Sequence, residues 1–209
     1  MTTTIRIFLA DDHPSLRFGL ASILHSEADF RVVAEAGSGA QVLEMVKTLE
    51  CDVIIMDLRM PHGDGTETTK ALQEMGYPAS VLVLTTYDNE EDIFAALEAG
   101  ARGYLLKDTT KDQLIEAVRR VHAGERYLPQ AVAARLADRM IRPILTPREL
   151  DVLRLVSRGR SNKEMAAAMF VSEETIKTHM KSLFQKLDVH DRAEAVAIAL
   201  QRGLIRLPH

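Results

Sequence analysis

Four short apolar segments in the first half of this 209-residue chain each end at a polar residue suited to phosphoryl chemistry. The residues that follow them are, in chain order, Asp11 and Asp12, then Asp57, Thr85 and Lys107. Short, β-branched apolar segments are typical of strands buried on both faces of a parallel sheet. Because ligands bind at the carboxyl ends of such strands, we expect three carboxylates, a hydroxyl and an ammonium to converge at one edge.

These side chains form a hard oxygen site of the kind that Mg²⁺ prefers. We expect Asp11 and Asp12 to bind the ion directly or through water. Asp57 would give the ion one oxygen and use the other as a nucleophile toward phosphorus, which makes an aspartyl phosphate. Lys107 and Mg²⁺ would neutralise the charge of the phosphoryl oxygens, and the Thr85 hydroxyl would donate a hydrogen bond to one of them.

The overall composition points to a globular protein of the cytosol. A hydrophobic fraction of 46% is ordinary for such a protein. No apolar stretch approaches the roughly 18 to 20 residues that a bilayer-spanning helix needs, and the first residues do not read as a signal peptide, so no membrane partner is expected. The single cysteine, Cys51, excludes an internal disulfide and fits a reducing compartment; we expect it to pack beside a strand.

The net charge of −4 hides an asymmetry between the two halves of the chain. Residues 1–141 hold 14 Lys and Arg against 22 Asp and Glu, a net charge of −8, whereas residues 142–209 hold 12 against 8, a net charge of +4. An acidic half joined to a basic half indicates two domains with different partners. A cation or phosphate site suits the first half, and nucleic acid suits the second.

The first half alternates strand and helix signals. Helix starts are marked by Ser38, Asp64 and Thr110, each with a Gln or Glu three residues later that would complete a capping box. Five strand–helix units in about 120 residues predict an α/β fold, a doubly wound five-stranded parallel sheet with right-handed crossovers. The strand-like segments lie near residues 5–10, 31–35, 53–57, 81–85 and 103–107.

The second half reads as a linker followed by a small all-α domain. Residues 125–145 form the linker, with a short helix after Pro129. Two short helices joined by a tight turn, followed by a longer basic helix, are the signature of a helix-turn-helix. The predicted domains are therefore residues 1–124, the linker 125–145 and residues 146–209. Helices are expected to begin at Thr146, where Glu149 would complete a capping box and Pro147 takes the first helical position, and at Asn162, Ser172 and Asp191.

The chain resembles a known family in both halves. Asp11-Asp12, Asp57 with the loop after it, Thr85, and Gly103 to Lys107 look like the receiver domain of a response regulator. The segment from Thr146 to Leu187 resembles a LuxR-type helix-turn-helix. Together they resemble the NarL/FixJ class of two-component transcription factors, over nearly all of the chain.

The resemblance implies roles for individual receiver residues. Asp57 would accept a phosphoryl group from a sensor histidine kinase, and Lys107 would contact that group. Thr85 would move toward the phosphoryl group, and Tyr104 would be the aromatic switch residue that follows it. The Mg²⁺ ligands would be Asp11, Asp12, Asp57 and the backbone carbonyl of Arg59.

The resemblance also implies double-stranded DNA as a partner, bound at promoter half-sites by a homodimer that forms on phosphorylation, with RNA polymerase as a further partner. An α-helix fits the major groove of B-DNA. In the helix after Ser172, a core stripe includes Ile176, Met180 and Leu183, and the basic residues lie mostly off it. Base-edge contacts are expected from Lys177, Thr178 and Lys181, and phosphate contacts from Thr175, His179, Lys186, Asn162 and Lys163.

Other function classes fit the residues less well. Haloacid-dehalogenase-like phosphatases also use a strand-end aspartate, but they need a second aspartate two residues later as general acid, where this chain has Arg59. We therefore expect no enzyme of that kind, but a switch. Two alternatives stay open: a signalling adaptor whose helical domain binds protein rather than DNA, and a receiver that works without phosphate.

Overall fold

The computed structural model describes residues 4–61 and 63–205. These residues form two compact units that divide between Ala134 and Arg135, with residues 89–91 grouped in the second unit. The division falls within helix α6 (Gln130–Ile141), inside the segment predicted as a linker with a short helix. Each unit is described below by itself.

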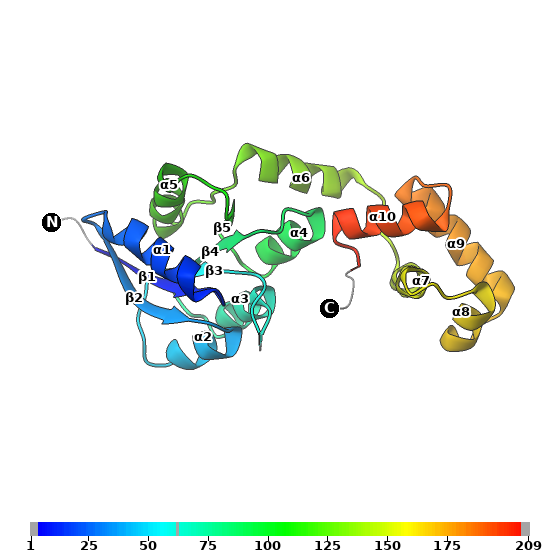
Figure 1. Cartoon of the computed structure of the whole chain (residues 1–209), viewed down its shortest axis with the longest axis horizontal. Helices are drawn as coiled ribbons and strands as arrows, with labels where there is room; N and C mark the ends of the chain where they lie inside the picture. The colour runs from blue at the N-terminus through cyan, green and yellow to red at the C-terminus, as the bar shows by residue number, and fades with distance from the viewer. Residues whose placement is uncertain (1–3, 62, 206–209) are drawn as a thin grey trace. The chain divides into compact units, whose positions relative to one another are not determined.

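The first unit is the predicted doubly wound sheet (Figure 1). Its five strands are all parallel, in the order β2-β1-β3-β4-β5. Each strand is followed by a helix, so the prediction of five strand–helix units is confirmed. The strands are β1 (Ile5–Ala10), β2 (Phe30–Ala36), β3 (Val53–Met56), β4 (Ser80–Thr85) and β5 (Gly103–Leu106), and the helices are α1 (Pro14–His25), α2 (Gly39–Met45), α3 (Gly65–Glu74), α4 (Glu90–Glu98) and α5 (Lys111–His122).

The strand register brings the residues predicted to carry phosphoryl chemistry to one edge of the sheet. Ala10 at the end of β1 lies opposite Met56 at the end of β3, and Thr85 at the end of β4 lies opposite Leu106 at the end of β5. The next residue after β1, after β3 and after β5 is therefore delivered to the same edge. Those residues are Asp11, Asp57 and Lys107.

The sheet is covered on both faces, as its continuous apolar strands predict. One core joins inward residues of β1, β3 and β4 to helices α1 and α5, and a second core joins the alternate strand residues to α2 and α3. Cys51 belongs to the second core and is 3% exposed, with its Sγ 3.5 Å from the Tyr77 hydroxyl. The expectation that Cys51 packs beside a strand is confirmed.

Helix starts in the first unit agree with the sequence in part. Thr110 forms the predicted capping box with Gln113. At Ser38 the hydroxyl accepts from the Gln41 amide as expected, but the Gln41 side chain accepts instead from the Gly37 amide, so the reciprocal half of the box is wrong. The Gly37 amide thus occupies the Gln41 Oε1 that the Ser38 amide would use in a capping box. Asp64 caps α3 through the Thr66 amide, one residue earlier than a capping box requires.

The second unit contains the predicted four-helix domain. The centre of this domain is formed by fully buried side chains, namely Leu153, Met165, Ile176 and Leu183. Among the described residues of the whole chain, no helix has the length and apolar character to span a bilayer. The helices of this domain are α7 (Pro147–Ser157), α8 (Asn162–Met169), α9 (Glu173–Leu187) and α10 (Arg192–Arg202).

The start of α8 corrects the sequence prediction by one residue. Ser161, not Asn162, is the N-cap, because its hydroxyl accepts from the Glu164 amide while the Glu164 carboxylate accepts from the Ser161 amide. Asn162 is thereby the first residue inside the helix. Ser172 and Asp191 cap α9 and α10 as predicted.

Candidate phosphoryl site and candidate nucleic-acid interface

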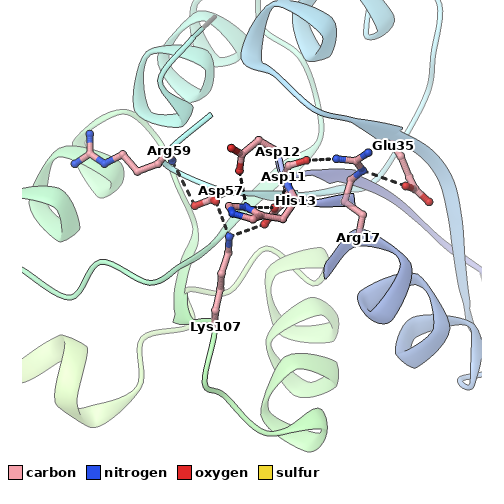
Figure 2. Close-up of polar contacts among 8 residues, drawn as sticks. All are labelled: Asp11, Asp12, His13, Arg17, Glu35, Asp57, Arg59 and Lys107. Atoms are coloured by element: carbon pink, nitrogen blue, oxygen red, sulfur yellow. Dashed lines mark hydrogen bonds and ion pairs between the residues drawn. The ribbon is translucent and has the colours of Figure 1, made fainter. Parts of the chain in front are cut away.

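Two buried carboxylates share one ammonium at the edge of the sheet (Figure 2). Lys107 Nζ lies 2.6 Å from Asp57 Oδ2 and 2.6 Å from Asp11 Oδ2. The side chains of Asp57 and Asp11 are 4% and 5% exposed. Carboxylates this buried are stable as anions only beside a cation. The structure thus brings together three of the residues that the sequence analysis placed at this edge.

Lys107 is held in its charged form. Burial lowers the pKa of its ammonium, but the hydrogen bonds to Asp11 and Asp57 outweigh burial, and the pKa is raised above its ordinary value. A permanently charged ammonium beside a carboxylate nucleophile is suited to neutralising the oxygens of an incoming phosphoryl group. The Lys107 amide donates to the Thr85 carbonyl at 2.8 Å, which fixes the strand end from which the side chain starts.

Asp12 and His13 lie at the open side of the same cluster. Asp12 Oδ1 is buried and accepts no hydrogen bond from the described part of the chain, although His13 Nδ1 lies 2.7 Å away. Single ligand atoms of Asp11, Asp12, His13 and Asp57 all lie within 4.8 Å of one another. His13 was not predicted to belong to the site, and its only sequence signal is its place directly after the aspartate pair.

The donor set fits a hard divalent cation. Three carboxylates converge at the edge of the sheet, and one of their buried oxygens lacks a hydrogen-bond donor among the described residues. Mg²⁺ takes such oxygen ligands and retains several waters, which the half-exposed position of Asp12 allows. The carbonyl of Arg59, also expected as a ligand, belongs to the loop that follows Asp57, where the Arg59 amide lies 3.3 Å from Asp57 Oδ1.

Thr85 and Tyr104 are both fully buried. The Thr85 hydroxyl accepts from the Tyr87 amide at 3.4 Å, and the Tyr104 hydroxyl donates to the Tyr87 carbonyl at 2.7 Å. Burial raises the pKa of Tyr104, so its hydroxyl remains a donor. The two predicted switch residues therefore hold opposite sides of one peptide segment, at Tyr87, in the loop between β4 and α4.

Arg17, in α1, supports the cluster of carboxylates. The sequence did not predict this role of Arg17. Its guanidinium donates to the Asp11 carbonyl and to Glu35 Oε2, and so ties the residue at the end of β1 to the neighbouring strand (Figure 2). Arg17 lies one turn into a helix with no motif around it. Only the three-dimensional path of α1 past the edge of the sheet brings it there.

In the second unit, α9 presents a basic face. Lys177, Thr178 and Lys181 are exposed, while His179 is half-buried. Ile176, Met180, Leu183 and Leu187 are buried, and Phe184 packs partly against the same core, so the predicted core stripe is confirmed. The three residues predicted to contact base edges thus share the solvent side of one helix.

The residues predicted to contact phosphate are placed less uniformly. Lys163 is exposed on α8, whereas the Asn162 side chain accepts a hydrogen bond from Arg192. The Thr175 hydroxyl pairs with the Ser172 hydroxyl at 2.8 Å. Lys186 Nζ lies 2.7 Å from Glu149 Oε2 and donates to the Ile144 carbonyl at 3.1 Å. The ammonium of Lys186 is therefore already engaged within its own domain.

Glu149 is the residue that pairs with Lys186, and it also contacts two other parts of the domain. Besides closing the capping box of α7, its carboxylate accepts from Ser182 Oγ at 2.6 Å and pairs with Lys186. Burial raises its pKa, but the hydrogen bonds from Lys186, Ser182 and Thr146 outweigh it and lower the pKa to about 2. One buried carboxylate thus fixes the end of α9 to the start of α7.

The fold and the two sites define a class of protein: a receiver domain joined to a helix-turn-helix output domain. Residues 7–119 match the family described as the response regulator receiver domain, and residues 143–199 match the bacterial regulatory proteins of the luxR family. The chain belongs to the two-component response regulators of the NarL/FixJ family.

Relatives match this chain over nearly their whole length. The chain is 39% identical to the nitrate/nitrite response regulator protein homolog of Haemophilus influenzae, over 97% of this chain and 100% of that protein. It is 38% identical to the nitrate/nitrite response regulator protein NarP of Escherichia coli, over 96% of each. Among solved structures, RcsB of Salmonella enterica serovar Typhimurium, bound to a promoter in the presence of the phosphomimetic BeF₃⁻, matches with a TM-score of 0.75 at 28% identity over 96% of this chain and 100% of that chain.

Proposed function

We propose that this response regulator is a DNA-binding transcriptional regulator switched by phosphorylation of Asp57. The observation that carries the proposal is the pair of 2.6 Å contacts from Lys107 Nζ to Asp57 and Asp11 at the carboxyl edge of the sheet. This arrangement provides a nucleophile, a fixed positive charge and a set of oxygen ligands within one cluster. No general acid follows Asp57 at the second position, so the site is suited to holding a phosphoryl group rather than to rapid turnover.

In this mechanism an oxygen of Asp57 attacks phosphorus, and the bond to the donor breaks. With a sensor histidine kinase the leaving group is the histidine nitrogen, and with acetyl phosphate it is acetate. Lys107 meets the new phosphoryl oxygens with its ammonium, and the Thr85 hydroxyl turns from the Tyr87 amide to donate to one of them. Mg²⁺, held by Asp11, Asp12, Asp57 and the Arg59 carbonyl, would add positive charge that neutralises those oxygens.

Movement of Thr85 is the step that transmits phosphorylation from the site to the rest of the receiver. Its hydroxyl and the Tyr104 hydroxyl both hold the Tyr87 segment in the loop between β4 and α4. Loss of the Thr85 contact frees one side of that segment, so phosphorylation biases a two-state element of the receiver. We infer that this bias favours a homodimer, which places two helical domains on paired half-sites.

DNA is the partner proposed for the helical domain. Its support is the basic, exposed face of α9, a helix of the width that enters the major groove. The RcsB structures solved on DNA provide a relative of the same organisation with that partner. We assign base-edge contacts to Lys177, Thr178 and Lys181. Phosphate contacts are assigned to Thr175, His179, Lys163, Asn162 and, once released from Glu149, Lys186.

The phosphorylation proposal is tested with radiolabelled acetyl phosphate and Mg²⁺ on the full chain. The wild type should incorporate acid-labile phosphoryl label, and Asp57→Asn should abolish it. Asp112→Asn, which removes a carboxylate from the first turn of α5, is the matched control and should label like the wild type. Unchanged labelling of Asp57→Asn would refute Asp57 as the acceptor.

The DNA proposal is tested by duplex binding at several salt concentrations. Affinity should fall steeply with salt, since released counterions drive such binding. Lys181→Ala should weaken binding to a selected half-site by roughly 1–3 kcal/mol. Arg154→Ala, which removes an exposed charge from α7 of the same domain, should have a smaller effect. Absence of salt-sensitive DNA binding would instead favour the adaptor class, in which the helical domain binds protein.

A further inference from the structure

Arg59 makes a set of contacts that the reaction at Asp57 does not itself use. Its Nη1 donates to Asp64 Oδ2 at 3.0 Å, and its Nη2 lies 2.8 Å from both carboxylate oxygens of Asp92. The guanidinium also stacks over the Tyr87 ring, 4.7 Å from its centroid. Asp64 caps α3, and Asp92 lies in α4. One side chain thus joins the loop after β3 to α3, to α4 and to the loop before α4.

The pairing with Asp92 is a buried one. The Asp92 side chain is 5% exposed and that of Arg59 is 23% exposed. A carboxylate removed from water to this extent depends on its hydrogen-bonded cation, and losing that cation costs far more than breaking a surface pair. The Arg59 guanidinium therefore contributes to fixing the position of the α4 start.

The same guanidinium lies against the segment that holds both switch hydroxyls. Tyr87, on which Arg59 stacks, accepts from Tyr104 through its carbonyl and donates to Thr85 through its amide. Arg59 therefore contacts neither Thr85 nor Tyr104 in these interactions but is linked to both through Tyr87. Any change in the Arg59 contacts reaches the loop between β4 and α4 by a route separate from the Thr85 hydroxyl.

Arg59 also starts beside the phosphoacceptor. Its amide lies 3.3 Å from Asp57 Oδ1, while the guanidinium points away from Asp57 (Figure 2). To meet a group attached to Asp57, the guanidinium would turn about its own side-chain bonds to another staggered rotamer. A phosphoryl group carries about −1.5 to −2 charge and three acceptor oxygens, which a guanidinium fork matches better than a single ammonium does.

We propose that Arg59 is a positioning residue that latches α4 through Asp92, and that a phosphoryl group on Asp57 draws its guanidinium away and releases α4. The inference rests on the proposed phosphorylation of Asp57. It adds a charge-exchange route to α4, in which Asp92 and Asp64 give up the guanidinium to the phosphoryl oxygens. Arg59 acts through Asp92 and Tyr87, and is not itself a reacting group.

Amide hydrogen exchange on the full chain, with and without acetyl phosphate and Mg²⁺, tests the latch. In the wild type, phosphorylation should raise the exchange rate of α4 amides about tenfold or more, the effect of losing a charged hydrogen-bond pair. Asp92→Asn should show that raised rate before phosphorylation and little further change after it. Asp112→Asn, the same substitution in the first turn of α5, should behave like the wild type.

A second variant separates the latch from the Thr85 route. In Arg59→Ala, α4 exchange should be raised from the start, and phosphorylation should not raise it further, while exchange in α1 shows that the receiver is folded. Phosphorylated wild type with unchanged α4 exchange, or Arg59→Ala with α4 still protected, would overturn the latch and leave the proposed function intact. Failure of the wild type to accept phosphoryl at all would overturn both.

Discussion

At the scale of single residues, the ion pairs among the described residues range from buried to largely exposed. The pairs of Lys107 with Asp11 and Asp57 involve carboxylates that are at most 5% exposed, whereas pairs such as Lys47 with Glu44 are more than half exposed. Exposed pairs contribute little to stability, and solvent replaces them readily. Buried pairs leave an uncompensated charge when one partner is removed. Only the buried pairs can transmit a change of charge to the fold.

Removal of the Lys107 ammonium should therefore destabilise the receiver. In Lys107→Gln, Asp11 and Asp57 face each other without their shared cation, and we expect a loss of about 3–5 kcal/mol. Mg²⁺ should restore more stability to this variant than it adds to the wild type, because the ion neutralises the same carboxylates. The measurement is urea unfolding of the full chain with and without Mg²⁺.

The control is Lys111→Gln, which removes a half-exposed lysine that pairs with Glu27. Its stability should change by no more than about 1 kcal/mol, and its response to Mg²⁺ should match the wild type. Equal responses of Lys107→Gln and Lys111→Gln to Mg²⁺ would refute a shared role of the ion and Lys107 at these carboxylates.

At the scale of elements, close backbone packing fixes where the loops of the candidate phosphoryl site lie. Gly65 opens α3 directly against the residue that follows β3, and a Cβ at this position would lie 2.0 Å from the Asp57 carbonyl oxygen. No other residue type fits there without moving one of the two backbones. The glycine therefore lets α3 begin close enough to hold the loop that contains Arg59.

In the helical domain, a carboxylate fixes one element to another. Glu149 has a pKa of about 2 in the folded chain against an ordinary value of 4.5. Because the pKa is lowered on folding, the stabilisation is fully present above about pH 4.5 and is lost as the pH falls toward 2. The shift corresponds to about 3 kcal/mol. The stability of α9 should fall over that pH window. It is measured by unfolding the full chain at a series of pH values and monitoring the NMR signals of Leu183 and Leu187.

Glu149→Gln should lack this part of the pH dependence. Glu164 provides the matched control, because it also closes a capping box and its pKa is also lowered to about 2, mainly by hydrogen bonds from Ser161. Its side chain is half exposed, so water satisfies it once the cap is lost, and Glu164→Gln should change the acid response of α9 less. An equal effect of the two variants would contradict the role of burial at Glu149.

The elements and the cluster at the sheet edge could be predicted from the sequence because the signals are local. Apolar strands ending at Asp11, Asp57 and Lys107 fix both the sheet and its chemical edge. Arg17 and the partners of Arg59 could not be predicted, because their contacts join positions brought together only by the path of the helices. Asp92 is one of several acidic residues at the start of α4, and no local pattern distinguishes it from its neighbours.

At the scale of the whole molecule, the charges follow the two units. The acidic receiver holds the site proposed for phosphoryl chemistry, and the basic helical domain holds the surface proposed for DNA. If phosphorylation pairs two chains, each complex gains a second basic surface, and the affinity for a paired half-site should rise steeply.

We therefore expect phosphorylated wild type to bind a duplex with two half-sites at least about tenfold more tightly than the unphosphorylated chain. The Asp57→Asn chain should bind with the unphosphorylated affinity in both conditions. Fluorescence anisotropy with a labelled duplex measures the difference, and a duplex with a single half-site is the control that should respond less. Equal gains on both duplexes would argue against pairing as the source of the affinity.

The burial of Cys51 has a consequence for the kinetics of opening. It is the single thiol of the chain, it is 3% exposed in the receiver core, and burial raises its pKa, so the reactive thiolate is scarce in the folded state. Modification by a thiol reagent must then wait for the receiver core to open. A short pulse of such a reagent on the unaltered chain records how often the core around α2 and α3 opens, and whether a bound phosphoryl group slows that opening.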